Sequence, residues 1–156
     1  GTRVVSLGAV EVRRELETVV TELEERARRA GVALVVEGDP AITIAVRPRM
    51  LRVVAQNLAE NAIRYAGPGA TLTLAVEREG DEVVVRATDD GLGVDEAQLS
   101  RLFERFFRAD RARASRGTGL GLAIVKHVVG QAGGTVEAAG GLGAGLEIRC
   151  TFPAAR

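Results

Sequence analysis

The amino-acid sequence predicts one globular domain that mixes α-helices and β-strands. Three observations support this class. The chain has 156 residues, 46% of them hydrophobic and 27% charged, which is enough for a single core. Apolar residues recur at helical spacing in several stretches of ten or more residues. Shorter apolar segments alternate with polar residues and are joined by turn sequences, as strands are.

The first elements are a long helix and two short strands. Apolar residues at helical spacing between Leu16 and Ala30 predict a helix that ends at Gly31, with Ser6 as a plausible N-cap. Residues 32–36 and 42–46 are expected to form two strands, because the turn sequence 38–40 (Gly-Asp-Pro) separates them.

A second helix is predicted at 48–66, with Pro48 in its first turn. Asn57, Asn61 and Arg64 lie beside its apolar stripe rather than opposite it. Asn disfavours helix interiors, and these two amides lie about 6 Å apart along the axis. They either bond neighbouring loops or form a polar lip that faces a ligand.

A hairpin follows, with strands at 71–79 and 82–88 around a Gly-Asp turn. The second strand runs into Asp89, Asp90 and the glycines Gly91 and Gly93. A carboxylate at a strand end before such a turn is a natural corner for a ligand. Such an Asp can equally bond its own backbone.

Residues 96–107 are expected to hold one or two short helices that carry three of the four Phe residues. Arginines interleave with them and continue to Arg116 without apolar periodicity. Because Lys plus Arg and Asp plus Glu balance at 21 each, we interpret the segment as a flap that attracts phosphate, not as a nucleic-acid surface.

Glycines at positions 117, 119 and 121 then lead into a helix that ends near 131–134. Free backbone N–H groups at a helix N-terminus favour a phosphate, although a flexible loop before a buried helix would have the same pattern. Strands at 135–139 and 146–152 close the fold around the glycine-rich turn 140–145, and Cys150 is expected in the core.

Four ordered motifs resemble the ATP-binding catalytic domain of sensor histidine kinases, a branch of the superfamily that includes gyrase, Hsp90 and MutL. Residues 57–65 resemble the N box of that family and 89–93 its first glycine box. Residues 102–108 are similar to its F box and 117–122 to its second glycine box. The resemblance covers nearly the whole chain.

The resemblance implies a Bergerat-type two-layer α/β sandwich, in which helices cover one face of a mixed, mostly antiparallel sheet. It implies one catalytic domain over residues 1–156, with an ATP lid at about 95–116. ATP and Mg²⁺ are the implied cofactors. Asn61 would ligate the metal, and Asn57 and Arg108 would act in catalysis. The implied ATP-binding residues are Asn57, Asn61, Arg64, Tyr65, Asp89, Gly91, Gly93, Val94, Arg108, Gly117, Thr118, Gly119, Leu120, Gly121 and Leu122.

The implied partners are a separate dimerising phosphoacceptor domain of the same protein and, through it, a response regulator. The implied location is cytoplasmic, as part of a membrane-anchored sensor, and no apolar run here is long enough to insert in a membrane. An ATP-hydrolysing switch is the first alternative, but such relatives have a Glu where Asn57 stands, and Glu60 is the only substitute nearby. A related serine kinase and a nucleotide sensor without catalysis are further alternatives.

Overall fold

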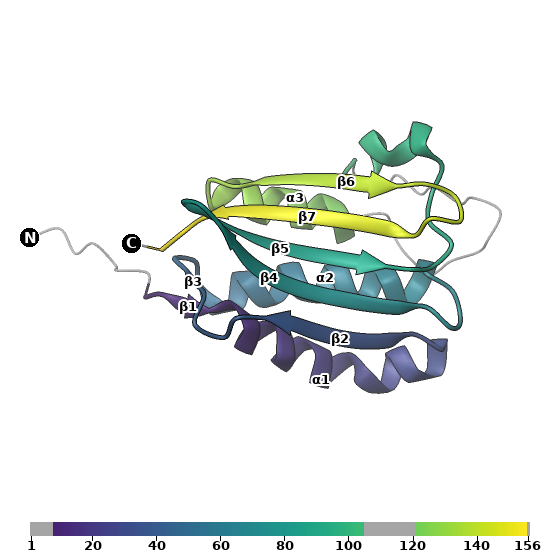
Figure 1. Ribbon diagram of the computed structural model, residues 1–156, viewed down its shortest axis with the longest axis horizontal. Helices are drawn as coiled ribbons and strands as arrows, with labels where there is room; N and C mark the ends of the chain where they lie inside the picture. Colours follow the sequence, from purple (N-terminus) through teal and green to yellow (C-terminus); the bar gives the residue numbers. More distant parts are fainter. Residues whose placement is uncertain (1–7, 105–120, 156) are drawn as a thin grey trace, which may run out of the picture.

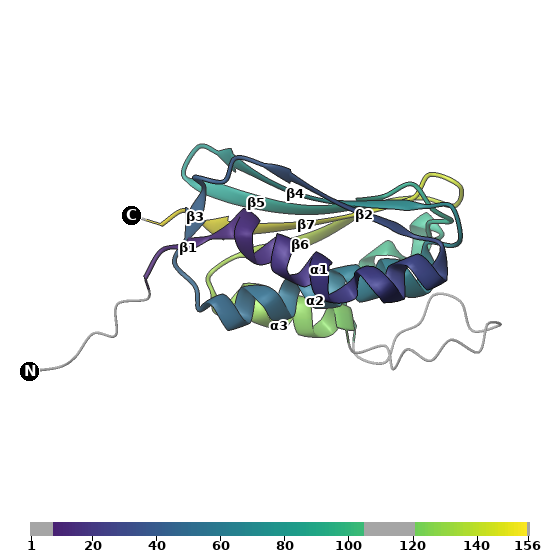
Figure 2. The same ribbon diagram turned by 90° about the horizontal axis from the view of Figure 1, so that it is seen from below.

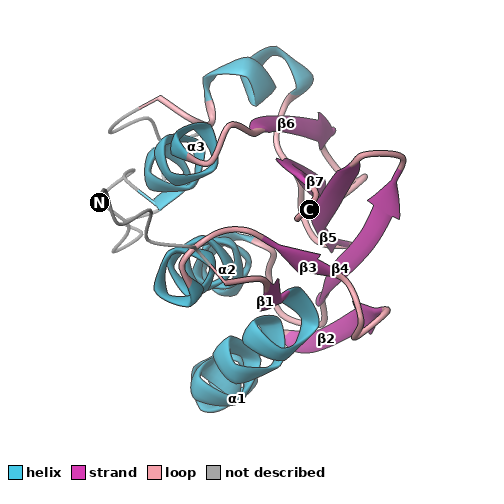
Figure 3. Cartoon of the chain, turned by 90° about the vertical axis from the view of Figure 1, so that its left-hand side faces the viewer, coloured by secondary structure: helices cyan, strands magenta, loops and turns pink. Residues whose placement is uncertain are grey.

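The computed structural model describes residues 8–104 and 121–155. Helices α1 (Val12–Ala30), α2 (Pro48–Tyr65) and α3 (Gly121–Gln131) form one layer, and a β-sheet forms the other. Figure 3 shows the two layers end-on, with the helices on one side of the strands. The predicted two-layer sandwich is confirmed.

The main sheet has five strands in the order β2-β4-β5-β7-β6. Strand β2 (Ala33–Gly38) runs parallel to β4 (Thr71–Glu79), and the other neighbours are antiparallel. Strand β5 (Glu82–Asp89) is central, beside β7 (Leu146–Pro153), and β6 (Thr135–Gly140) forms the far edge (Figure 1). The sheet is therefore mixed and mostly antiparallel, as expected.

The first strand of the chain was not predicted. Strand β1 (Val10–Glu11) pairs with β3 (Thr43–Ile44), and α1 begins directly afterwards at Val12. The predicted strand at 42–46 is therefore shorter than expected, and it pairs with β1 in a separate two-stranded sheet instead of joining the main sheet. The expected N-cap, Ser6, lies outside the described residues, and the prediction was wrong, because the N-cap of α1 is Glu11.

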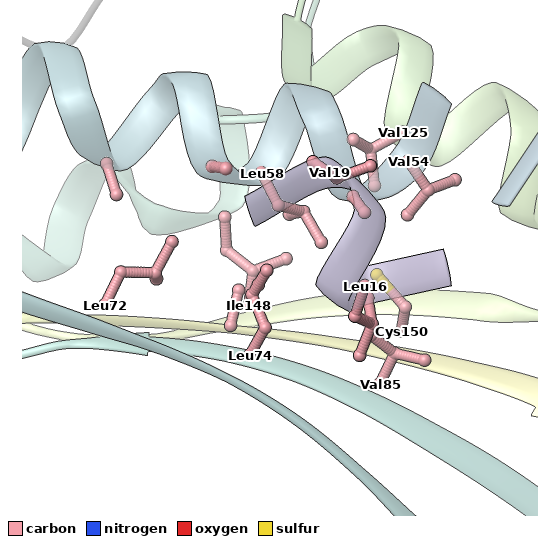
Figure 4. Packing of buried hydrophobic residues seen from close by; sticks show 14 of the residues in the cluster. Leu16, Val19, Val54, Leu58, Leu72, Leu74, Val85, Val125, Ile148 and Cys150 are labelled. Carbon is pink, nitrogen blue, oxygen red and sulfur yellow. The ribbon is translucent and has the colours of Figure 1, made fainter. Parts of the chain in front are cut away.

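The predicted helix faces form the core. Leu16 and Val19 of α1, Val54 and Leu58 of α2, and Leu74 of β4 belong to one cluster of buried residues (Figure 4). Cys150 is fully buried in the same cluster, as predicted. Burial raises the pKa of its thiol to about 12, because an apolar surrounding disfavours the thiolate.

Residues 96–101 form one short 3-10 helix, η1 (Glu96–Arg101), within the segment 96–107 where one or two short helices were expected, and residues 105–107 of that segment lie outside the described residues. The Asp95 side chain caps it by accepting a hydrogen bond from the Ala97 backbone N–H at 3.0 Å. None of the helices described is both long and apolar enough to cross a membrane. The elements thus leave one end of the sheet, where β5 ends and α2 finishes, for the predicted site (Figure 1).

Candidate functional site

Asp89 is the last residue of β5 and the one buried charged side chain among the described residues, with 8% of its surface exposed. Desolvation raises the pKa of its carboxyl above the usual 3.8, and the charge of Asp90 acts in the same direction. Hydrogen bonds from the backbone N–H groups of Gly91 and Leu146 work against this shift. Asp89 is therefore a buried hydrogen-bond acceptor whose carboxylate is held by backbone N–H groups. An Asp in a surface turn would be exposed to water instead.

The turn after Asp89 is held by its neighbours. The Gly91 N–H donates to Asp89 Oδ1 at 2.9 Å, so the carboxylate does bond its own turn, one of the two possibilities left by the sequence. Asp90 Oδ1 accepts a hydrogen bond from the Thr71 N–H at 2.6 Å, which joins the end of β5 to the start of β4.

Gly91 also fits closely against the end of α2. A Cβ at this position would lie 2.2 Å from the Ala66 carbonyl oxygen, which is closer than any side chain can approach. The next N–H, of Leu92, donates to the same oxygen at 3.0 Å. A glycine is therefore required at position 91 for the contact between the turn after Asp89 and the end of α2.

The polar residues of α2 occupy the margin of its buried face, as predicted. Asn57 and Asn61 are partly buried, Tyr65 is partly buried, and Arg64 is exposed. Asn57 Nδ2 donates to the Val53 carbonyl oxygen one turn earlier at 2.7 Å, which orients its amide. The two partly buried amides, four residues apart, thus lie along the same edge of α2.

Asn57 meets the start of α3, which lies 64 positions later in the chain. A Cβ placed on Gly121, the first residue of α3, would be 3.2 Å from Asn57 Oδ1. The predicted N box and the end of the predicted second glycine box are therefore adjacent in space. Leu122 has its side chain in the core, so only its backbone can reach a ligand there.

Other predicted site residues have different outcomes. Val94 packs partly buried against the core, and Gly93 adopts φ +68° in the corner. The remaining predicted residues, Arg108, Gly117, Thr118, Gly119 and Leu120, lie outside the described residues, as does the expected lid beyond residue 104.

Glu60, the one nearby candidate for a general base, is engaged elsewhere. Its Oε2 lies 2.9 Å from Arg26 Nη1 of α1, on the side of α2 that faces α1. Glu60 and Asn57 project from α2 at directions about 60° apart around the helix axis, so a carboxylate held in that ion pair is directed to a different side than the Asn57 amide. The structure therefore offers no carboxylate at the position that a water-activating base needs in the described part of α2.

The described residues contain no group of three or more His, Cys, Asp or Glu side chains that could hold a metal ion. Mg²⁺ is commonly bound by one or two protein oxygens together with substrate phosphates, and the Asn61 amide can supply such an oxygen. The residues present fit a metal that arrives with a nucleotide better than a permanent metal centre.

Sequence reasoning missed the contribution of the turn between β6 and β7. It identified residues 140–145 as a hairpin turn, but Leu146 directly after it donates a backbone hydrogen bond to Asp89. The signal was the glycine content of this turn, four of six residues. Without the pairing of β5 and β7, nothing in the sequence connects it to Asp89.

A helix layer on a mixed sheet, with a buried carboxylate at a strand end and amides on the adjacent helix, defines the class of Bergerat-fold ATP-binding domains. A family model described as "Histidine kinase-, DNA gyrase B-, and HSP90-like ATPase" matches residues 46–156. The chain belongs to this family, whose members bind ATP, and within it is a catalytic domain of the sensor histidine kinase type.

Relatives of known identity agree. Sensor-like histidine kinase SenX3 of Mycobacterium tuberculosis is 33% identical over 146 residues, which cover 90% of this chain and 36% of the relative. Adaptive-response sensory kinase SasA of Synechococcus elongatus is 35% identical over 144 residues, covering 90% and 37%. The chain thus spans about a third of the length of the curated relatives it matches.

Solved structures show the same fold. Mycobacterial sensor histidine kinase MprB superposes with a TM-score of 0.82 at 27% identity, covering 94% of this chain and 98% of that one. Full-length ShkA in complex with AMPPNP superposes with a TM-score of 0.84 at 29% identity, covering 99% of this chain and 32% of that one.

Proposed function

We propose that this chain is a single catalytic domain, residues 1–156, that binds ATP with Mg²⁺ and donates the γ-phosphoryl group to a histidine. The acceptor lies on a separate dimerising domain of the full-length protein, which then passes the phosphoryl group to a response regulator. The domain would act in the cytoplasm as part of a membrane-anchored sensor. Membership of the histidine kinase family supports this proposal.

Base recognition is assigned to Asp89. Its carboxylate, buried and held by backbone N–H groups, accepts a hydrogen bond from the amino group of adenine. Guanine has an oxygen at the matching position, which a carboxylate repels, so the same group selects ATP over GTP. Tyr65 packs against the base, and Gly91, Gly93 and Val94 line its pocket.

The phosphates are assigned to the opposite part of the site. Asn61 offers its amide oxygen to Mg²⁺, which would screen phosphate charge when bound. Asn57 and Arg64 line the phosphate channel, and Arg108 contacts the transferred group. Backbone N–H groups at Gly117, Thr118, Gly119, Leu120, Gly121 and Leu122 complete the cradle.

Transfer requires little chemistry from the domain itself. An imidazole nitrogen of the acceptor histidine attacks the γ-phosphorus, the bond to the bridging oxygen breaks, and ADP leaves. The domain contributes alignment and charge stabilisation. Asn57 stands where a hydrolase needs a base, and a neutral amide cannot accept the proton of a water.

The observation that carries the choice of a kinase over a hydrolase is the placement of Asn57 against Gly121, with Glu60 paired to Arg26. The edge of α2 assigned to the phosphates thus presents an amide, and Glu60, the one carboxylate of α2, is engaged with another helix. This favours transfer to an external acceptor over attack by water.

The test is labelling with γ-labelled ATP. The isolated domain should show negligible hydrolysis and no self-labelling, and adding the acceptor domain from its own full-length protein should produce acid-labile phosphohistidine. Asn61→Ala and chelation of Mg²⁺ should each abolish transfer. Gln56→Ala, which removes an exposed amide from the same helix, should not.

Three results would contradict the proposal. Brisk hydrolysis by the isolated domain that is lost in Glu60→Gln would favour an ATPase switch. ATP binding without transfer to the acceptor would favour a nucleotide sensor. Labelling on serine would favour a serine kinase.

A further inference from the structure

The turn between β6 and β7 lies at the same end of the sheet as Asp89 (Figure 1). Strand β7 starts at Leu146, which is opposite Asp89 of β5 on one side and Gly140 of β6 on the other. The tip of the turn, Leu142, is 72% exposed. The proposed function assigns this turn no role, although it contacts residues 89–93, which include the proposed base-binding carboxylate.

The contact is formed by backbone against backbone. Gly145 has φ +74°, and a Cβ there would lie 2.0 Å from the Asp89 carbonyl oxygen and 3.2 Å from the Asp90 Cα. On the other side, a Cβ on Gly93 would lie 2.1 Å from the Gly141 carbonyl oxygen. Any side chain at these positions must push the turn and the corner apart.

Hydrogen bonds join the same two segments. The Gly143 N–H donates to the Leu92 carbonyl oxygen at 2.9 Å. The Leu146 N–H donates to the Asp89 carboxylate, as the Gly91 N–H does at 2.9 Å. Gly91 belongs to the same turn as Asp89, so Leu146 is the donor that ties this carboxylate to another part of the chain.

Two N–H donors set where the carboxylate oxygens point, and hydrogen-bond strength falls steeply with misalignment. Because a carboxylate that accepts backbone hydrogen bonds also keeps its charge more readily, the same donors preserve the acceptor that adenine needs. A displacement of Gly145 would move the Leu146 donor directly, since the two residues are adjacent in sequence.

We propose that Gly145 and Leu146 are positioning residues for base selection. They set the orientation of the Asp89 carboxylate through a close backbone contact and one N–H donor. This inference rests on the proposed function, and within it makes ATP selectivity depend on residues more than fifty positions after the carboxylate itself.

The test compares Gly145→Ala with Gly80→Ala in equilibrium binding of ATP and of GTP. Both glycines have positive φ, but a Cβ at Gly80, in the turn at the opposite end of the sheet, meets nothing within 4 Å. We expect Gly145→Ala to lower ATP affinity about ten-fold or more, with a matching fall in the preference for ATP over GTP. Gly80→Ala should keep both within about two-fold of the parent.

A double-mutant cycle separates positioning from general damage. If Gly145 acts through the carboxylate, Gly145→Ala should cause no further loss of selectivity in an Asp89→Asn background. Additive losses would overturn the inference, and so would unchanged selectivity in Gly145→Ala. A parent domain that does not prefer ATP would instead overturn the proposed function.

Should Gly145→Ala fail to fold, the parent domain still decides the question. Its Leu146 amide proton must shift in NMR spectra when Asp89 is protonated, and again when ATP is added. A Leu146 amide that responds to neither change would overturn the inference.

Discussion

Protonation of Asp89 should weaken nucleotide binding and stabilise the free domain. Desolvation raises the pKa of this carboxyl above 3.8, so protonation begins at a higher pH than for an exposed Asp. The protonated group loses its charge-assisted acceptor, which is worth about 1.5–3 kcal/mol, or about ten- to a hundred-fold in affinity. Affinity should therefore fall as the pH falls through the raised pKa.

The effect on folding has the opposite sign. The folded state holds this proton more tightly than the unfolded state does, so the domain releases protons when it unfolds. The free energy of unfolding therefore declines as the pH rises. The contribution of Asp89 is most favourable below 3.8 and is lost as the pH rises from there through the folded pKa. The buried, ionised carboxylate of Asp89 thus lowers the free energy of unfolding at neutral pH.

Calorimetric titration with ADP across this pH range, in the parent and in Asp89→Asn, measures the first effect. Protonation of the nucleotide itself is common to both proteins and cancels in the comparison. Asp81→Asn is the matched control, since Asp81 is exposed, lies in the turn at the other end of β5 and is not among the groups that shift the pKa of Asp89. Urea unfolding of the same proteins measures the second effect.

Either of two results would contradict this role of Asp89. One is an Asp89→Asn variant whose ADP affinity and pH dependence equal those of the parent. The other is a difference in unfolding free energy between Asp89→Asn and the parent that stays constant over the range in which the folded carboxyl titrates.

Three further predictions follow from other contacts. Glu60→Gln and Arg26→Gln should each lower the free energy of unfolding by no more than about 1 kcal/mol and leave phosphoryl transfer unchanged, and loss of transfer in Glu60→Gln would contradict a structural ion pair. Gly130→Ala should raise the free energy of unfolding by about 0.5–1 kcal/mol, because a Cβ at this position in α3 meets nothing within 4 Å. Gly91→Ala should lower it by about 1–3 kcal/mol, because its Cβ would clash with Ala66. Equal melting temperatures for the two variants would contradict this prediction. The Cys150 thiol, with its pKa raised to about 12, should resist thiol reagents at mildly alkaline pH until the domain unfolds, and rapid reaction in the native state would contradict its burial.

Elements with a local pattern could be predicted from the amino-acid sequence. The apolar stripes of α1 and α2, and the alternation in β4 and β7, repeat over enough residues to indicate both the type of element and its buried face. Pro48 and Gly31 mark helix ends because their backbone preferences act within one turn. The same kind of signal made Asn57, Asn61 and Asp89 candidates, since each is unusual for its local position.

Which of these elements pack against one another is seen only in the folded chain. The pairing of β1 with β3, and the exclusion of 42–46 from the main sheet, depend on contacts between residues about 33 positions apart, for which two-residue strands carry no periodic signal. The meeting of Asn57 with Gly121, and of Asp89 with Leu146, likewise follows from the sheet order β2-β4-β5-β7-β6 and from helix packing. Periodicity records which face of an element is buried, whereas the partner of that face is chosen by packing across the whole core.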